Sequence, residues 1–315
     1  MKTETFSFTN PTDKLPTQLC AVIFALLVSV VSLANKLASV YQLPFLVLFY
    51  RYLFAFLGNV IFRKVHLFSY SFHGKGRRSL LVINAFVYVT SQGLQIFGLM
   101  YAPSILFAIM FATVPIWAEI LSFFILKERT GLKATLLVLV SLAALITMLL
   151  LGQKEKAGAV SLLGFILLLL SSIGEAFNNI LIRFLRKEYT PMEINYCATG
   201  IALVICTLFL VFSCIRSEGM FSEMLQASSQ PGFLLPSVYL GVGGTLGAGI
   251  FKGIILQRMS ALKASAWSNV ASALAIVFGV VLLRETLHGY QIICTVVIIG
   301  SVLGIQSMKT VSQKK

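Results

Sequence analysis

Apolar residues occur along this chain in long runs that are separated by short stretches rich in Gly, Pro and charge. A helix that crosses a bilayer needs about 20 mainly apolar residues. Runs of about this length cover residues 18–36, 44–62, 79–99, 102–126, 132–151, 160–182, 192–214, 233–255, 261–283 and 289–308. The pattern therefore predicts an all-α membrane protein with ten transmembrane helices. Most connections are short, and the longer ones are 63–78 and 215–232.

Composition agrees with the membrane class. Hydrophobic residues make up 58% of the chain and charged residues 11%, with a mean hydropathy of +0.91. Soluble domains are closer to half apolar and a quarter charged, so an ordinary soluble domain is excluded. No A-x-A-like cleavage site follows the first apolar run, and the segment before that run is polar and mixed in charge, so we expect no removed signal peptide.

Lys and Arg are divided unequally between the two predicted sides. Loops on the side of the termini hold 18 of these residues and the opposite loops hold 5, while Arg51 and Lys252 fall inside spans. The positive-inside rule predicts a multi-pass protein of the inner (cytoplasmic) membrane with both termini in the cytoplasm. The same rule explains the net charge of +14 without nucleic acid. The expected partners are the lipid bilayer and a small-molecule substrate, and a monomer and a homodimer both remain open.

The two halves of the chain share a pattern. FILKERTG (124–131) and VLLRETLH (281–288) each end an apolar run with a basic residue followed by Glu, and Lys127 and Arg284 lie 157 positions apart. The same offset aligns 101–115 with 258–272, and an offset of 147 aligns 43–56 with 190–203. The chain therefore predicts two five-helix units.

The predicted units are residues 18–151 and 160–308, with a linker at 152–159 and cytoplasmic tails at 1–17 and 309–315. Because five is odd, the second unit enters the membrane from the opposite side. Such inverted repeats are typical of secondary transporters, whose substrate site lies between the repeats near the midplane.

The shared basic–Glu motif suits helix ends. Lys127 and Arg284 follow the last turn of a helix, where a cation interacts favourably with the dipole. Glu128 and Glu285 suit the first turn of the next helix. We expect a structural role for these four residues rather than a substrate contact.

These features resemble a known family. An Arg after a Pro-led second span (Pro44, Arg51), Pro115 in the fourth span, and Leu-x-Glu-Arg/Thr at the end of both fourth spans are similar to EamA-like members of the drug/metabolite transporter superfamily, over about 18–308. Ser272 stands where the first unit has Pro115, and Lys127 and Arg284 replace a usual Gly. The resemblance implies a metabolite carrier, often an exporter of amino acids or related compounds. Similar members move S-adenosylmethionine, choline or sugar-linked substrates.

Four charged residues lie inside predicted spans, where charge is costly and points to function. They are Arg51, Glu119, Glu175 and Lys252, and their repeat partners Ala198, Ile276, Val28 and Gln95 carry no charge. Two other interpretations remain open. The charges can pair as Glu/Arg and Glu/Lys bridges that lock helices, or Arg51 and Lys252 can reach an interface with their long side chains.

Polar and aromatic side chains accompany these charges. Phe111, Pro115, Glu119 and Ser122 share a helical stripe, as do Ser171, Glu175, Asn178, Asn179 and Ile182. The further candidate substrate-binding residues are Tyr88, Gln95, Trp267 and Asn269. Such residues also serve as interhelical hydrogen bonds in membranes. The glycines of 241–253 are compatible with close packing and with bending.

The sequence thus predicts a secondary active transporter that moves a small polar or zwitterionic metabolite, such as an amino acid, by alternating access. Glu119 and Glu175 would meet an amino group and Arg51 or Lys252 an anionic group, and either Glu is a candidate for a coupling proton or cation. The alternative is an exchanger or importer of an organic cation such as S-adenosylmethionine or choline. No nucleophile motif, metal cluster or nucleotide-binding loop is present, so we expect no enzyme, no cofactor and no metal site.

Overall fold

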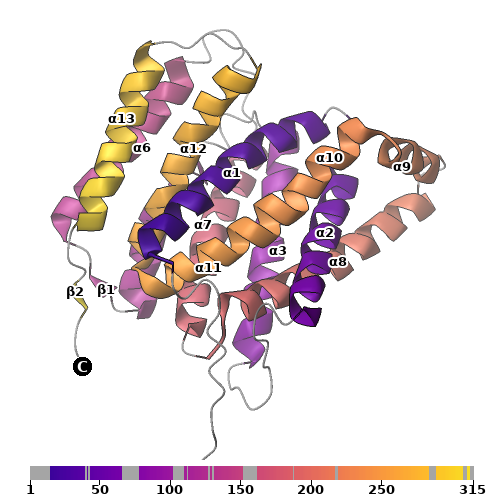
Figure 1. Ribbon diagram of the computed structural model, residues 1–315, viewed down its shortest axis with the longest axis horizontal. Coiled ribbons are helices and arrows are strands. Elements are labelled where there is room, and N and C mark those ends of the chain that lie inside the picture. The colour runs from indigo at the N-terminus through magenta and orange to yellow at the C-terminus, as the bar shows by residue number, and fades with distance from the viewer. Residues whose placement is uncertain are drawn as a thin grey trace, which may run out of the picture.

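The computed structural model describes residues 15–39, 41, 43–65, 78–101, 110–111, 113–126, 128–129, 131–151, 162–186, 188–216, 219–283, 289–307 and 311–312. Figure 1 shows a bundle of long helices. In the first half these are α1 (Thr17–Ser39), α2 (Pro44–Lys64), α3 (Arg78–Tyr101), α5 (Val114–Leu121) and α6 (Leu132–Leu151). In the second half they are α7 (Leu162–Leu185), α8 (Pro191–Arg216), α9 (Met220–Ser228), α10 (Pro231–Tyr239), α11 (Ala248–Arg258), α12 (Ala261–Leu283) and α13 (Gly289–Ser307).

Two π-helical segments continue these helices. η1 (Ser122–Leu126) extends α5, and η2 (Leu240–Gly247) joins α10 to α11. Helical structure lies within every predicted range, although part of 102–126 falls outside the described residues. By length and apolar composition, the described segments able to cross a membrane are Thr17–Asn35, Pro44–Lys64, Leu162–Leu185, Pro191–Arg216 and Pro231–Arg258. Shorter apolar helices lie at Val114–Leu126, Leu132–Thr147 and Ile292–Ile305.

Local sequence explains where several helices begin. A proline occupies the first turn of α2, α5 and α10, where its missing N–H costs no helical hydrogen bond. At the start of α8, the backbone N–H of Thr190 donates to Glu193 Oε2 at 2.9 Å, and the N–H of Glu193 donates to Thr190 Oγ1 at 3.3 Å. This reciprocal pair is a capping box, and it fixes the first turn of the helix.

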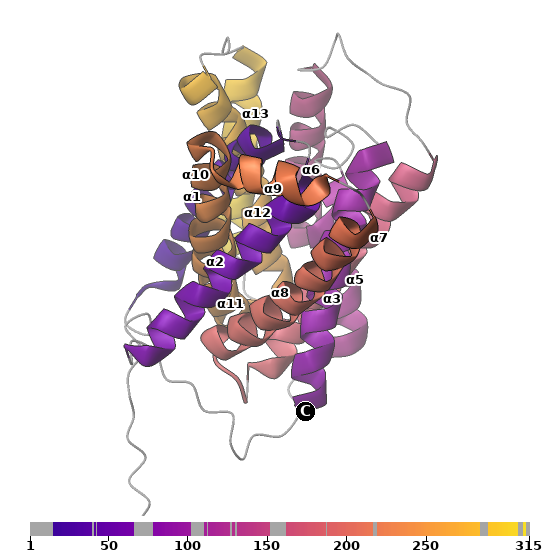
Figure 2. The same cartoon turned by 90° about the vertical axis from the view of Figure 1, so that its right-hand side faces the viewer.

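Helices at equivalent positions in the two halves make equivalent contacts in the described structure. α3 packs against α7, and α1 packs against α10, η2 and α11, which correspond to α3 in the second half. Similarly, α5 packs against α7, and α12, the counterpart of α5, packs against α1. α2 contacts its counterpart α8, and α6 contacts its counterpart α13, as Figures 1 and 2 show. Exchanging the two halves therefore leaves the pattern of helix contacts largely unchanged.

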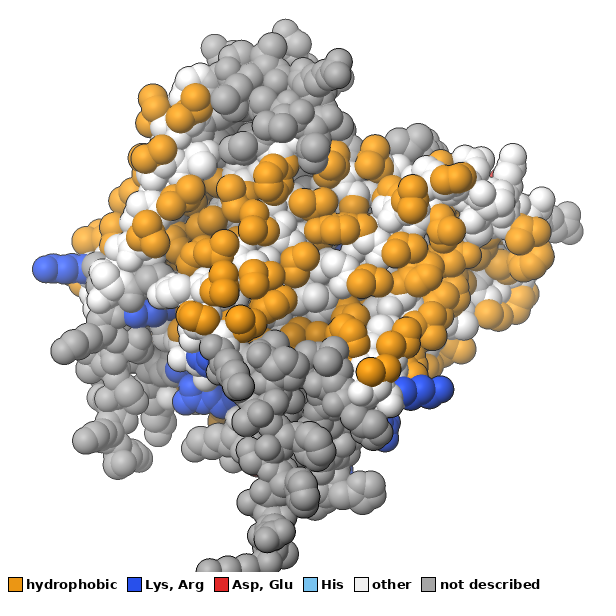
Figure 3. Space-filling model, in the orientation of Figure 1, with side chains coloured by type: hydrophobic (Ala, Val, Ile, Leu, Met, Phe, Trp, Pro, Cys, Tyr) orange, Lys and Arg blue, Asp and Glu red, His pale blue; other side chains and the backbone are white. Residues whose placement is uncertain are grey.

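The outer surface is apolar over much of the face in Figure 3, while Lys and Arg side chains gather along its lower edge. Large hydrophobic residues such as Leu208, Phe212 and Leu139 are exposed. In water such a surface would be unfavourable, but it suits contact with lipid tails. The surface supports a membrane protein.

Two expectations about connections are wrong. The segment 215–232 is not entirely a loop, because its residues 220–228 form α9. Glu128 does not lie in the first turn of the next helix, because α6 begins at Leu132. Instead the two-residue strand β1 (Glu128–Arg129) pairs antiparallel with β2 (Val311–Ser312), so this connection is held by the C-terminal segment. Lys127, Arg284 and Glu285 lie outside the described residues.

Candidate functional site

The middle of α7 presents a polar face to its neighbours. Ser171, Glu175, Asn178 and Asn179 are all buried, at steps of three and four residues, whereas Leu163, Ile166 and Leu170 on the opposite side are exposed. Polar groups avoid lipid because it offers no hydrogen bonds, so this stripe turns towards other helices. The sequence-based expectation for the direction of the stripe therefore agrees with the structure.

Hydrogen bonds connect this face to both halves of the chain. Ser171 Oγ donates to the carbonyl of Ser91 at 2.8 Å, and Asn84 Nδ2 donates to Asn178 Oδ1 at 2.7 Å. Both partners belong to α3. On the other side, Asn179 Nδ2 donates to Ser265 Oγ of α12 at 3.2 Å. These contacts fix the rotation of α7 and thereby the direction of Glu175.

Glycine permits the close approach of α3 and α7. A Cβ atom at Gly174 would lie 3.0 Å from Ser91 Cβ, which is tighter than ordinary contact. Small residues at such crossings allow backbones in membranes to pack closely. Gly174 therefore helps to place the neighbouring Glu175 next to the first half of the chain.

Glu175 is paired with Lys252. The ammonium group of Lys252, in α11, donates to Glu175 Oε1, and the two side chains are only 17% and 9% exposed. The second carboxylate oxygen, Oε2, is buried without a hydrogen-bond partner among the described residues. The Glu/Lys bridge that the sequence left open is thus present in the structure.

Arg51 has a different environment. Its Nε donates to Thr245 Oγ1 at 2.6 Å, and the described residues include no carboxylate within ion-pair distance of its guanidinium. The sequence-based alternative of a Glu/Arg bridge is therefore wrong for Arg51 among the described residues. Arg51 lies in the middle of α2, and its side chain is half-buried.

The glycine-rich η2 brings Thr245 to Arg51. A Cβ at Gly241 would lie 2.6 Å from Phe54 Cβ and 2.8 Å from the carbonyl oxygen of Arg51. The backbones of η2 and α2 are consequently in direct contact, which supports the close-packing interpretation of these glycines. In this wide helix Thr245 Oγ1 donates to the carbonyl of Leu240, five residues earlier, at 2.9 Å. π-Helical turns occur frequently at functional sites.

Tyr88 of α3 lies near both charged groups. It interacts electrostatically with both Arg51 and Glu175. Its ring lies edge-on to that of the buried Tyr52, with centroids 6.2 Å apart. Arg51, Tyr88, Glu175 and Lys252 therefore form one polar cluster, to which α2 and α3 contribute from the first half and α7 and α11 from the second.

Glu119 is held elsewhere. Its Oε1 accepts a hydrogen bond from Thr135 Oγ1 of α6 at 2.6 Å. The helix that carries it, α5, packs against α7 and α12. Phe111, from the same predicted stripe, packs on a small apolar cluster that includes Val114 and Ile180. The hydrogen bond between Glu119 and Thr135 therefore lies on the α5–α6 side.

The three remaining candidates lie on α12 and α3. Asn269 Nδ2 of α12 donates to Ser141 Oγ of α6 at 3.1 Å, which is an interhelical bond of the expected kind. Trp267 is buried in the main apolar core, and its Nε1 has no hydrogen-bond partner among the described residues. Gln95 is half-buried in α3.

Sequence reasoning missed several partners of the polar residues. They are Tyr52, Asn84, Thr135, Ser141, Thr245 and Ser265, and most are single hydroxyl or amide side chains in apolar runs. Asn84 and Thr245 carry a signal that was available, because an amide or hydroxyl in a lipid-spanning helix generally needs a partner. The positions of these residues in the sequence do not indicate which residue that partner is.

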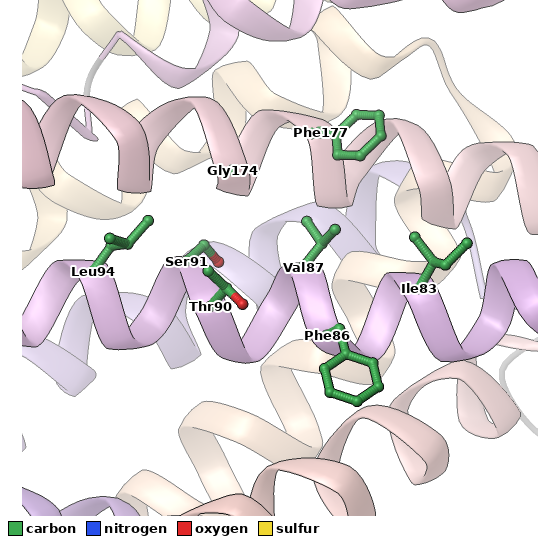
Figure 4. A pocket seen from close by; sticks show the side chains of 8 residues that line it. All are labelled: Ile83, Phe86, Val87, Thr90, Ser91, Leu94, Gly174 and Phe177. Carbon is green, nitrogen blue, oxygen red and sulfur yellow. The ribbon is translucent and has the colours of Figure 1, made fainter.

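A groove of about 350 Å³ lies between α3 and α7. Figure 4 shows its walls, which include Ile83, Phe86, Val87, Leu94 and Phe177. Ile83 and Phe86 are about half exposed, so the groove opens on the apolar outer surface. Its lining contains none of the four intramembrane charges. We therefore place the candidate site at the polar cluster.

The fold and the polar cluster define a multi-pass membrane protein whose two halves meet around buried charges. The EamA-like transporter family matches residues 15–150 and 162–307, and the chain belongs to this family. It is 26% identical over 294 residues to the "Uncharacterized transporter YcxC" of Bacillus subtilis (strain 168), covering 93% of both chains. It also resembles a solved structure described as "Crystal structure of protein", with a TM-score of 0.71, 15% identity, and coverage of 92% of this chain and 96% of that one. That similarity concerns the fold alone.

Proposed function

We propose that this chain is a secondary active transporter that moves a small polar or zwitterionic metabolite across the cytoplasmic membrane by alternating access. The observation that carries the proposal is the polar cluster of Arg51, Tyr88, Glu175 and Lys252, in which both halves of the chain take part. Membership of a transporter family supplies the activity class. In secondary transporters the substrate site lies where the two repeats meet.

The site offers both hydrogen-bond acceptors and hydrogen-bond donors. Glu175 Oε2 and Asn179 Oδ1 are buried acceptors without a partner in the described part of the chain, and they lie one helical turn apart. Arg51 supplies donors. A ligand with an amino or hydroxyl group and an acidic group matches this combination, whereas an apolar ligand would leave these groups unsatisfied.

The helix contacts support an inverted repeat. α3 with α7 and α1 with α11 are equivalent contacts when the halves are exchanged, as are α5 with α7 and α12 with α1. Rocking of one repeat against the other around a fixed site is the usual form of alternating access. The Lys and Arg side chains at the lower edge of Figure 3 support placing that edge in the cytoplasm, together with both termini.

The proposal is tested by reconstituting the purified protein in liposomes and measuring uptake of labelled amino acids and of organic cations such as choline and S-adenosylmethionine. Saturable uptake of amino acids above that of protein-free liposomes is expected. Saturable uptake of cations alone would favour the organic-cation alternative. Uptake of neither class would contradict the proposed function.

The coupling ion is tested with the same liposomes. Glu119→Gln and Glu175→Gln remove the two acids that are candidates for a proton or cation exchanged during the cycle. We expect at least one substitution to change the dependence of uptake on pH. If the double variant keeps both the rate and the pH dependence of the native protein, neither glutamate couples transport.

A further inference from the structure

The guanidinium of Arg51 retains unused donors. A guanidinium carries five N–H groups in a fixed fork. One, on Nε, donates to Thr245 Oγ1 at 2.6 Å, and the described residues provide no other acceptor and no carboxylate within ion-pair distance. In the part of the chain that the structure describes, the terminal nitrogens of the fork have no partner, which leaves them for a ligand.

Thr245 sets the direction of this fork. Its hydroxyl has a single hydrogen, which it donates to the carbonyl of Leu240 at 2.9 Å. A lone pair of Oγ1 therefore faces Arg51 and accepts from Nε. Because Nε is engaged, the end of the guanidinium opposite the side-chain stem is the part that can bind a planar acid with two parallel hydrogen bonds. An orientation fixed before binding lowers the entropy cost of recognition.

Glu175, the acid of the cluster, differs from Arg51 because it is already paired. Glu175 already has a counter-ion, since Lys252 donates to its Oε1. The pair has no net charge, and its free Oε2 can accept from a hydroxyl as well as from an ammonium group. Glu119 accepts from Thr135 on the α5–α6 side. Arg51 thus contributes a positive charge that no described residue pairs, in a region where an isolated charge is costly.

From this charge distribution we infer that Arg51 binds the anionic group of the substrate, and that this anion is the group that the site requires. A carboxylate with two parallel oxygens fits the fork, while the amino group of a zwitterion is dispensable. The inference rests on the proposed carrier function. It narrows the substrate class to zwitterions and organic acids, and it excludes cations that lack an acidic group.

The test compares matched ligands on the purified native protein. Leucine, phenylalanine and glutamine are each compared with the acid that lacks the amino group and with the amine that lacks the carboxylate. Binding to the folded state raises the melting temperature with ligand concentration. For at least one of the three series, we expect stabilisation by the amino acid and by its acid, and none by its amine.

Variants then assign the effect to Arg51. Arg51→Gln should weaken binding of the acid roughly tenfold or more, because a hydrogen-bonded charged contact is lost. Lys64→Gln removes an exposed cation from the same helix and should leave binding unchanged. Thr245→Val keeps the charge but removes the group that orients it, and a weaker affinity for the acid is expected here too. Thr245→Val takes the place of Arg51→Gln in the test if Arg51→Gln does not fold.

Each outcome has a distinct meaning. Stabilisation by the amine equal to or greater than that by the acid overturns the inference while the carrier proposal stands. Acid binding that is the same in Arg51→Gln, or in Thr245→Val where Arg51→Gln does not fold, also overturns it. If no member of any series binds, and the liposomes take up neither amino acids nor cations, the proposed function fails as well.

Discussion

Asn84 Nδ2 lies 2.7 Å from Asn178 Oδ1, and this hydrogen bond joins α3 in the first half of the chain to α7 in the second. Both amides are buried. The contact belongs to the same helix pair that positions Glu175. The stability that this hydrogen bond contributes therefore reports how firmly the two halves are held together at the candidate site.

Removing this amide pair should destabilise the protein modestly. Interhelical hydrogen bonds in membranes average about 0.6 kcal/mol and reach about 1.7 kcal/mol in double-mutant cycles. We expect a coupling energy in that range for Asn84→Ala combined with Asn178→Ala, measured by unfolding in detergent. A coupling energy of zero would mean that this hydrogen bond contributes nothing to holding α3 against α7.

The ion pair between Glu175 and Lys252 predicts a non-additive pattern. Lys252→Met leaves a buried carboxylate without its counter-ion, and breaking a buried pair in this way typically costs about 3–5 kcal/mol. The double variant Glu175→Gln/Lys252→Met removes both charges and should recover much of the lost stability. Thermal unfolding of the single and double variants measures this difference. If Lys252→Met and the double variant are destabilised equally, the ion pair does not form.

Gly241 should not tolerate a side chain. A Cβ there would lie 2.6 Å from Phe54 Cβ and 2.8 Å from the carbonyl oxygen of Arg51, so α2 and η2 would have to separate. Overpacking of this kind costs about 1–3 kcal/mol. Gly93→Ala is the matched control, because no atom lies within 4 Å of a Cβ at that helical position. A lowered melting temperature is expected for Gly241→Ala and not for the control.

Arg183 should stabilise the junction between α7 and α11. Its buried guanidinium donates to the carbonyls of Leu256, at 3.1 Å, and of Met259, which lie at the end of α11. Arg183→Met would leave these carbonyls unsatisfied, at a cost of about 1–3 kcal/mol. Arg186 donates to the carbonyl of Gln257 at 3.3 Å but is exposed, so Arg186→Met should change the melting temperature little. Similar losses for both variants would contradict this assignment.

Much of the architecture could be predicted because its cause is local. Long apolar runs become helices in lipid, since only internal hydrogen bonds can satisfy the backbone there. The stripe of Ser171, Glu175, Asn178 and Asn179 followed from helical periodicity, which a single segment contains in full. The short helix α9 was missed because its residues lie in a stretch with the polar composition of a loop.

The sequence by itself determined the membrane class, the repeated halves and the four charges placed in apolar surroundings. Only the tertiary structure decided which of these charges meet. Glu175 and Lys252 are separated by 77 positions, and Arg51 and Thr245 by 194. Contacts of this range depend on how whole helices cross, and the crossing is set by packing at small residues such as Gly174 and Gly241. The pairing of one acid, and the unpaired state of Arg51 among the described residues, therefore followed from the assembled bundle.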